Sequence, residues 1–284
     1  MVFGWAQDDG VTLSGPANLI NSEEDMIIPI SPFAPLLEPS DYVELFAHYP
    51  ASDFVINVAN YEARKEESDP SVSVHFFRLS RIMRDLLFTC SSIDLGFEMA
   101  RQTRREKKDW EGVRLYDLNQ TMLAPAAKMG GMPYAGTFHG SDTNYIYNGL
   151  LPEWPIGEED AKLSREFSRA FINFVYTGNP NGEGALSGDW PSAFGDKVDF
   201  ETIHEFRETT IEVIGGPYGS GSVVLKDGDL NVQEEEESLE RYQKIFDSAA
   251  MGSPGFEIKK ERLESEKLFQ RCRYLKSLDE KLGR

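Results

Sequence analysis

A short apolar run close to the start of the chain, VFGWA at residues 2–6, ends abruptly in the polar sequence QDDG at residues 7–10. An apolar run bounded at once by turn-forming residues predicts a short buried strand whose end presents a carboxylate. A native domain seldom opens on a core strand, because the first residues of a domain are usually frayed and polar. The position of this strand is therefore the first unusual feature of the sequence.

Helical patterns dominate much of the remaining chain. Between residues 72 and 88, apolar residues recur at three- and four-residue steps, which predicts a helix that faces the core. A second amphipathic helix, over residues 160–176, ends at the stop signal TGNPNG. We predict further helices at residues 40–48, 91–107, 238–250 and 257–282, strands at residues 113–118, 198–203 and 210–214, an irregular proline-rich segment at residues 21–39 and a flexible turn at residues 215–222.

The chain is strongly acidic. Its 284 residues include 29 Lys and Arg against 48 Asp and Glu, a net charge of −19, and 40% hydrophobic residues are enough for a core. A surface with this charge repels a phosphate backbone, so we expect no nucleic-acid binding. We interpret the basic cluster RQTRREKK at residues 101–108 as a solvated helix end. No apolar run is long enough for a membrane span, and the N-terminus lacks the pattern of a signal peptide.

Two cysteines, Cys90 and Cys272, limit the metal and redox chemistry of the chain. They can form at most one disulfide and cannot alone supply the four ligands of a structural zinc site. We expect no metal and no cofactor. Their oxidation state stays open at this stage. The triplet that begins at Asn119 is a glycosylation sequon, which matters only in a secreted chain.

The sequence GTFHGSD at residues 136–142 sets His139 in a glycine-flanked polar turn. An imidazole titrates near neutrality, so a loop histidine beside an acidic partner can take a proton from a nucleophile and return it to a leaving group. A hydrogen-bonded turn histidine without a chemical role is the alternative. His75 lies beside the apolar stripe of residues 72–88, where we expect an ordinary helix histidine with a satisfied hydrogen bond.

The order of these segments resembles the C-terminal half of the type-B carboxylesterase and lipase family, with a fungal character. The resemblance covers roughly residues 1–200 and rests on the strand followed by QDDG, RLSRIMRDLLFTC, VRLYDL, GTFHGSD, LSREFSRAFINFVYTGNPNG and a later WP pair. It implies the α/β class, as a partial α/β-hydrolase fold with a few sheet strands, a large helical insertion and C-terminal helices. We expect residues 1–230 to belong to this domain and residues 231–284 to form an acidic, helical extension packed on it.

The resemblance also implies roles for four residues. His139 stands where the family keeps its catalytic histidine, the general base, and Asp9 aligns with the acidic residue that orients it, usually a glutamate in a D-E-G turn. Aspartate is one methylene shorter, but it is common in this role among triads. The acid precedes the histidine, as in other α/β-hydrolases. Asp85 and Asp142 match recurring acidic positions, which we interpret as structural or supporting groups.

The nucleophile of the family's reaction is missing from the sequence. In this fold a serine sits in a G-x-S-x-G turn between a strand and a helix, and no such motif occurs among the 284 residues. No glycine-rich oxyanion motif precedes Asp9 either. Ser14 and Ser141 lie outside any such turn, and Ser141 is too close in sequence to His139 to attack in line. We therefore expect a truncated esterase that keeps the acid and the base and is inactive alone.

Expectations about partners follow from this truncation. Without the strands that precede the acid strand in the family, a strand edge and an apolar face are exposed, and such an edge tends to pair with another strand or to aggregate. Self-association through this edge is one expectation, and completion by the missing N-terminal half, for action on a small uncharged ester, is the other. The alternative function is a non-catalytic interaction or adhesion protein of the same fold. We expect secretion if the missing N-terminus has a signal peptide.

Overall fold

The structure of the chain, a computed structural model, describes residues 1–106, 112–148, 156–186, 188–195, 206–217, 219–227 and 256–283. The chain forms two compact units. Unit 1 comprises Met1–Gln7, Ser92–Leu123 and Gly140–Glu266, and unit 2 comprises Asp8–Ser91, Ala124–His139 and Lys267–Arg284. The domain boundary predicted at residue 230, the strand predicted at residues 198–203 and the helix predicted at residues 238–250 lie outside the described residues.

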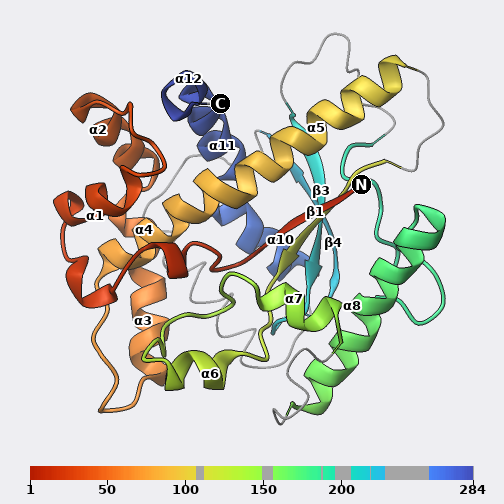
Figure 1. Cartoon of the computed structure of the whole chain (residues 1–284), viewed down its shortest axis with the longest axis horizontal. Helices are drawn as coiled ribbons and strands as arrows, with labels where there is room; N and C mark the ends of the chain where they lie inside the picture. Colours follow the sequence, from red (N-terminus) through yellow and green to blue (C-terminus); the bar gives the residue numbers. More distant parts are fainter. Residues whose placement is uncertain are drawn as a thin grey trace. The chain divides into compact units, whose positions relative to one another are not determined.

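Unit 1 is built on a four-stranded sheet with the strand order β1-β2-β3-β4 (Figure 1). The strands are β1 (Val2–Ala6), β2 (Arg114–Leu118), β3 (Glu208–Ile214) and β4 (Gly221–Lys226). The first three are parallel, with Val2 opposite Arg114 and Tyr116 opposite Glu212, and β4 runs antiparallel to β3. Every residue of β2 is buried, as expected for a strand paired on both sides in a parallel sheet. The strands predicted near residues 2–6, 113–118 and 210–214 are thus confirmed.

Aromatic side chains fill the core of unit 1. Tyr116 of β2 meets Phe167 and Phe171 of α8 (Glu158–Thr177) edge to face, with ring centroids 5.3 and 6.3 Å apart. Aromatic pairs prefer this geometry because the ring edge is positive and the ring face negative. Trp190 meets Tyr116 in the same way, and its Nε1 donates to the Leu115 carbonyl at 3.1 Å. The WP pair therefore holds its chain segment beside β2. Unit 1 also contains α7 (Ser141–Ile146), α10 (Phe256–Ser265) and the greater part of α5 (Cys90–Arg105).

The described part of unit 2 is helical. Its central helix is α4 (Val74–Arg84), the amphipathic helix predicted at residues 72–88, and its apolar stripe, including Phe76, Leu79 and Ile82, is fully buried. The Ser73 hydroxyl accepts hydrogen bonds from the N–H groups of His75 and Phe76 in the first turn of α4. The π-helical turn η4 (Asp85–Thr89) then continues α4 into α5. The other elements are η1 (Val11–Leu13), η2 (Ala17–Leu19), α1 (Glu23–Ile30), α2 (Pro39–His48), η3 (Ala51–Phe54), α3 (Val55–Arg64), α6 (Ala124–Met129), α11 (Leu268–Ser277) and α12 (Asp279–Leu282).

A disulfide and a half-buried aspartate connect the C-terminal helices to the rest of unit 2. Cys90, the first residue of α5, is bonded to Cys272 of α11. Asp53 accepts hydrogen bonds from Arg271 at 2.7 Å and from Lys267 at 2.9 Å. Because Arg271 is almost fully buried, its ion pair is shielded from solvent in a way that surface pairs are not. The C-terminal segment is thus part of the core of unit 2.

Two local predictions are wrong, and one strand is missing from the prediction. Residues 21–39, predicted to be irregular, contain α1, because Ser22 and Asp25 form a capping box that starts a helix, and Pro29 lies only in its last turn. The turn predicted at residues 215–222 leads directly into β4, where no strand is predicted. The single helix predicted at residues 257–282 is three helices, and Lys267, with a left-handed φ of 52°, separates the first two.

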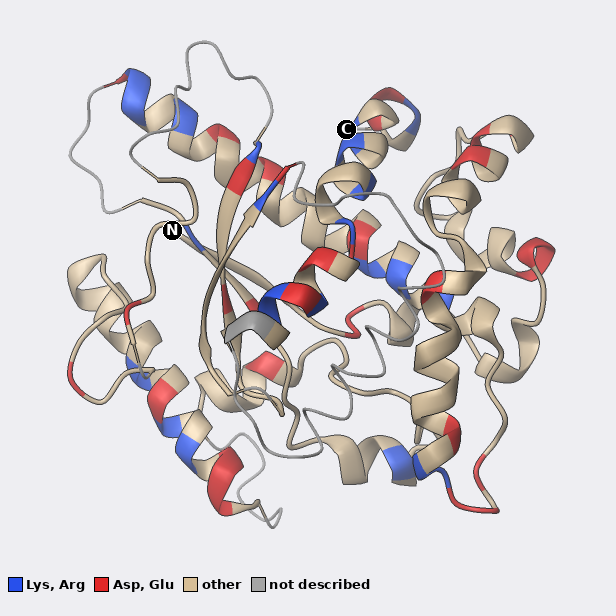
Figure 2. Cartoon of the chain, turned by 180° about the vertical axis from the view of Figure 1, so that it is seen from behind, with Lys and Arg blue, Asp and Glu red and all other residues tan. Residues whose placement is uncertain are grey.

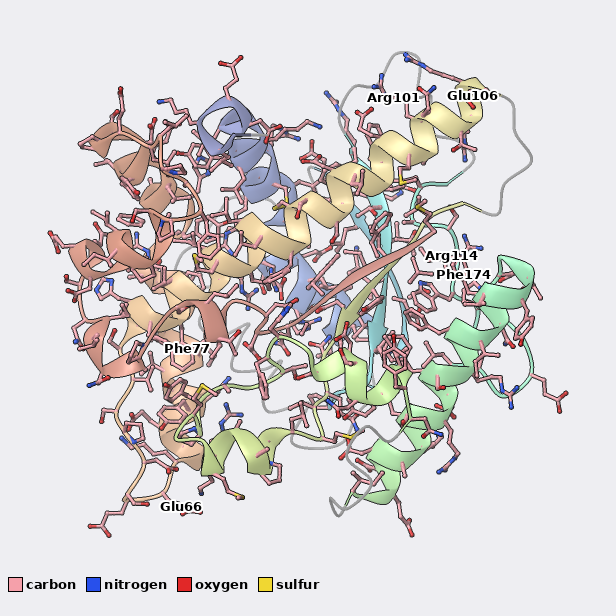
Figure 3. The ribbon with its side chains drawn as sticks, viewed as in Figure 1. Glu66, Phe77, Arg101, Glu106, Arg114 and Phe174 are labelled. Atoms are coloured by element: carbon pink, nitrogen blue, oxygen red, sulfur yellow. A yellow bond between two sulfur atoms is a disulfide. The ribbon has the colours of Figure 1, made fainter. Side chains whose placement is uncertain are left out.

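The described residues of the basic cluster, 101–106, include the last turn of α5. Figure 2 shows Lys and Arg residues gathered at this end of the helix, and Figure 3 shows Arg101 and Glu106 there. The Arg101 guanidinium donates to Glu98, one turn earlier, at 2.8 Å. An acidic partner within the helix is typical of a solvated helix surface. In the part of the chain that the structure describes, no helix is long and apolar enough to cross a membrane.

Candidate functional site

The acidic turn after β1 is seated on the backbone of α4. Gly10 permits this contact, because a Cβ at Gly10 would lie 1.9 Å from the Ser80 carbonyl oxygen and 2.6 Å from the Arg84 nitrogen. The Ser14 hydroxyl donates to the Gly10 carbonyl at 2.8 Å and closes the turn. Asp9, just before the glycine, is only 4% exposed. Helix α4 therefore determines where the Asp9 carboxylate projects.

The histidine turn lies against the same acidic turn. The Thr137 N–H donates to the Asp8 carboxylate at 2.9 Å, and the Asp8 N–H donates to the Thr137 carbonyl at 2.8 Å. Gly136 and Gly140 both have positive φ angles, 61° and 83°, which suit glycine. The turn at residues 136–140 is therefore shaped by its glycines and hydrogen-bonded to the residue that precedes Asp9.

Asp9 and His139 form the hydrogen bond that the sequence predicts. The distance between His139 Nδ1 and Asp9 Oδ1 is 2.7 Å. A carboxylate on Nδ1 keeps a proton there and leaves Nε2 to exchange a proton with a reacting group. The two side chains differ in exposure, since 54% of the His139 side chain is exposed against 6% of the Asp9 side chain. The pair thus has a buried acid and an accessible base.

One face of the His139 imidazole is covered by an aromatic ring. The Phe88 ring lies 4.7 Å from the imidazole, centroid to centroid, at an interplanar angle of 24°. Phe88 belongs to η4, and π-helical turns often occur at functional sites, because the wider turn changes the direction of a side chain. The sequence does not predict this contact, since an aromatic residue at the end of an amphipathic helix cannot be distinguished from a core residue by its spacing.

Asp85 is completely buried and paired within unit 2. Its carboxylate accepts two hydrogen bonds from the Arg84 guanidinium, at 2.8 and 2.6 Å, and one from the Tyr49 hydroxyl at 3.0 Å. Burial, with the Asp85 charge adding to it, raises the pKa of Tyr49 well above its usual value. These contacts belong to the junction of α4 and η4, so the structure gives Asp85 the surroundings of a structural group.

Asp142 is part of unit 1 and begins α7 together with Ser141. Its carboxylate accepts hydrogen bonds from the Tyr116 hydroxyl at 2.7 Å and from the Thr143 N–H at 2.8 Å. A carboxylate in the first turn of a helix interacts favourably with the helix dipole. Asp142 thus connects α7 with the central strand β2.

The two serines considered as substitute nucleophiles are both buried and hydrogen-bonded. Ser14 and Ser141 have no exposed surface. The Ser14 hydroxyl donates to the Gly10 carbonyl, and the Ser141 hydroxyl donates to the Thr121 hydroxyl at 3.0 Å. Neither hydroxyl is presented to an incoming ester.

His75 and Asn119, two further polar residues singled out in the sequence, are only partly exposed or buried. The expectation of a satisfied hydrogen bond at His75 is wrong for one nitrogen, since its buried Nδ1 has no partner. Asn119 of the sequon is 8% exposed and donates to Asp117, which leaves its amide inaccessible to a glycan. Among the described residues, no group of three or more His, Cys, Asp or Glu side chains is placed to hold a metal ion.

Residues 40–210 match the sequence profile of the carboxylesterase family. The chain belongs to the carboxylesterase family. The matched segment includes Asp85, His139 and Asp142, whereas Asp9 precedes it. The predicted membership is thus confirmed by most of the chain between α2 and β3.

Fungal members of the carboxylesterase family are among the relatives. The chain is 30% identical over 204 residues to the inactive carboxylesterase-like protein VdtD of Byssochlamys spectabilis, a match that covers 70% of this chain and 33% of the relative. It is 27% identical over 188 residues to a secreted lipase of Arthroderma benhamiae, covering 63% of this chain and 28% of that protein. The matches thus span about a third of the length of these curated relatives.

The crystal structure of Aspergillus niger EstA shows the same fold. The similarity has a TM-score of 0.57 at 16% sequence identity and covers 99% of this chain but 40% of EstA. It confirms a partial α/β-hydrolase fold, in which a mixed sheet is combined with many helices.

Proposed function

We propose that this chain is the acid and base part of a serine carboxylic ester hydrolase, in which His139 is the general base and Asp9 orients it. The observation that supports this function is the 2.7 Å hydrogen bond between His139 Nδ1 and Asp9 Oδ1. A serine hydroxyl is a weak nucleophile near neutral pH, so it needs a base, and the base needs a third group to fix its tautomer. This chain supplies the base and the third group.

The nucleophile and the oxyanion donors come, in this proposal, from sequence outside these 284 residues. The G-x-S-x-G motif is absent, and both candidate serines are buried and hydrogen-bonded, so the chain is inactive by itself. β1 is the last strand on its side of the described sheet, and its outer edge is where strands of a completing polypeptide, or of a second copy, would add. The substrate of the completed enzyme is a small uncharged ester.

We further propose that the completed protein is secreted. Two relatives are named secreted lipases, one from Arthroderma benhamiae and one from Botryotinia fuckeliana. The Cys90–Cys272 disulfide supports this proposal, because disulfides persist in oxidising compartments and are rare in the cytosol.

The proposal is tested by labelling and by complementation. The purified chain is treated with an alkyl fluorophosphonate and with p-nitrophenyl butyrate, and we expect neither labelling nor turnover. It is then combined with the N-terminal part of an active fungal lipase of the family, and we expect turnover that H139Q abolishes and the control H75Q retains. Turnover by the isolated chain that depends on His139 would refute the claim of inactivity, and complemented turnover that H139Q leaves unchanged would refute the role of the base.

A non-catalytic interaction protein is the second candidate. The observation that favours it is the 30% identity to a relative named as an inactive carboxylesterase-like protein. Sedimentation and thermal melting distinguish the two candidates. A stable monomer that melts cooperatively and cannot be complemented favours a self-sufficient binding protein, whereas an aggregating chain favours an incomplete enzyme.

A further inference from the structure

We propose that Asp8 is a positioning residue for His139. Asp8 acts through the backbone of Thr137 and never on the substrate. The inference rests on the proposed function, because it assumes that the bond between Asp9 and His139 prepares a general base. The two hydrogen bonds between Asp8 and Thr137 are called the Asp8–Thr137 clamp below.

The clamp joins two chain segments at a single point. One bond runs from the Asp8 N–H to the Thr137 carbonyl at 2.8 Å, and the other from the Thr137 N–H to the Asp8 Oδ2 at 2.9 Å. Residue 137 therefore has both of its backbone polar groups bonded to residue 8. The next residue after Asp8 is the acid, and the second residue after Thr137 is the base. Fixing residue 137 against residue 8 thus brings His139 within reach of Asp9.

Gly136 makes room for the accepting carboxylate. A Cβ at Gly136 would lie 2.1 Å from Asp8 Oδ2, a separation that real Cβ atoms do not show, and its φ of 61° is unfavourable for other residues. The absence of a side chain at residue 136 therefore creates the space that the Asp8 oxygen occupies.

The Asp8 carboxyl group makes this clamp and also lies near arginines of neighbouring helices. Burial raises the pKa of the Asp8 carboxyl, while Arg81, the Thr137 N–H, Arg64 and Arg84 oppose that rise. The Asp9 carboxylate is instead bonded to the imidazole. The two adjacent carboxylates therefore have separate tasks, since one fixes the loop and the other fixes the tautomer of the base.

Loss of the clamp should loosen the acid–base pair without removing it. Hydrogen bonds of this kind have heavy-atom distances of about 2.7–3.2 Å, so a displacement of about 1 Å breaks the 2.7 Å contact between His139 and Asp9. Residue 137 is only two residues from His139, so a displacement at residue 137 is passed on to the imidazole. The bond to Asp9 would then be open for a larger fraction of the time.

The test follows the Nδ1 proton of His139 by NMR in the full chain labelled with 15N at histidine, and H139Q assigns the signal. D8L keeps the size of the side chain but removes the acceptor, and we expect the Nδ1 proton to exchange with water about tenfold faster, the change that loss of one hydrogen bond produces. D8N retains an amide oxygen that can accept the Thr137 N–H, and we expect exchange within about twofold of the wild type.

D69A is the matched control, because Asp69 also accepts a backbone N–H, from Glu66 at 2.9 Å, at another place in unit 2. It should leave the His139 signal unchanged. Exchange in D8L within twofold of the wild type would overturn the proposal. If D8L does not fold, hydrogen exchange is measured on the wild type at increasing denaturant concentration. The exchange rates of the Thr137 amide proton and the His139 Nδ1 proton should rise with the same denaturant dependence, and different dependences would overturn the proposal. Neither readout needs ester turnover, so failure here is distinct from failure of complementation.

Discussion

Removing the Cys90–Cys272 disulfide should destabilise unit 2 by several kcal/mol. The bond joins residues 182 apart in sequence. In the chain-entropy account, a cross-link restricts the unfolded chain by an amount that grows with the logarithm of the loop length, which for a loop this long is about 5 kcal/mol at 25 °C. Native disulfides removed from proteins typically cost about 2–5 kcal/mol, so we expect a loss within that range.

The variant C90A/C272A measures this loss. Both cysteines are buried, and alanine avoids placing serine hydroxyls without partners in the core. All four tryptophans fall within the residue ranges of unit 1, so their fluorescence follows that unit, whereas circular dichroism also detects the helices of unit 2. In urea, the dichroism transition of the variant should move to lower concentration by about 1–2 M, and ahead of the fluorescence transition.

Reduced wild-type protein is the control, because it lacks the same bond and should unfold at the same urea concentration as the variant. A dichroism midpoint that the double substitution leaves unchanged would refute the reasoning that this link restricts the unfolded chain. A shift confined to fluorescence would show that the bond stabilises unit 1 instead of unit 2.

Three further predictions concern single residues. Burial raises the pKa of Glu212 to about 7 from an ordinary value of 4.5, so the protonated side chain stabilises the fold below pH 4.5 and this stabilisation is lost as the pH rises through about 7. E212Q should remove this pH dependence and raise the free energy of unfolding at pH 8 by up to about 3 kcal/mol, seen as a higher urea midpoint than that of the wild type. Equal midpoints at pH 8 would contradict the prediction. D85N removes the carboxylate charge that lies 2.6 Å from the fully buried Arg84 guanidinium and should cost about 3 kcal/mol in thermal or urea unfolding; a loss below about 1 kcal/mol would exclude this expectation. G136A meets Asp8 Oδ2 and should lower the melting temperature clearly more than G131A, whose positive φ is similar but whose Cβ would meet nothing within 4 Å; equal losses in the two variants would show that only the backbone angle matters.

The sequence predicts the three parallel strands of unit 1 and the contact between Asp9 and His139 better than it predicts β4 and the connecting segments. The residues RLYDL form β2 and are all buried, because β2 is paired on both sides in the sheet. The apolar residues of this segment predict such a buried strand. The contact between Asp9 and His139 follows from family motifs, not from periodicity, since 130 residues separate the two side chains. No local pattern can indicate a contact at that separation.

Local exceptions account for most of the wrong or missing predictions. The prolines of residues 21–39 predict irregular structure, but a capping box of Ser22 and Asp25 starts a helix before Pro29 can interrupt it. Phe88 and Asp8 were not recognised as neighbours of His139, because one has the spacing of a core residue and the other stands beside a second aspartate. Their roles depend on tertiary contacts, namely the ring stacking at 4.7 Å and the hydrogen bond to Thr137.

The contact between Asp9 and His139 has a consequence that does not depend on catalysis. Asp9 and His139 both belong to unit 2, and their hydrogen bond fastens a loop to the core of that unit. The contact therefore has a structural use even in a chain that holds no nucleophile. A histidine bonded to a carboxylate is thus no sign of hydrolysis by itself, because the reaction also needs the serine that such a pair would activate.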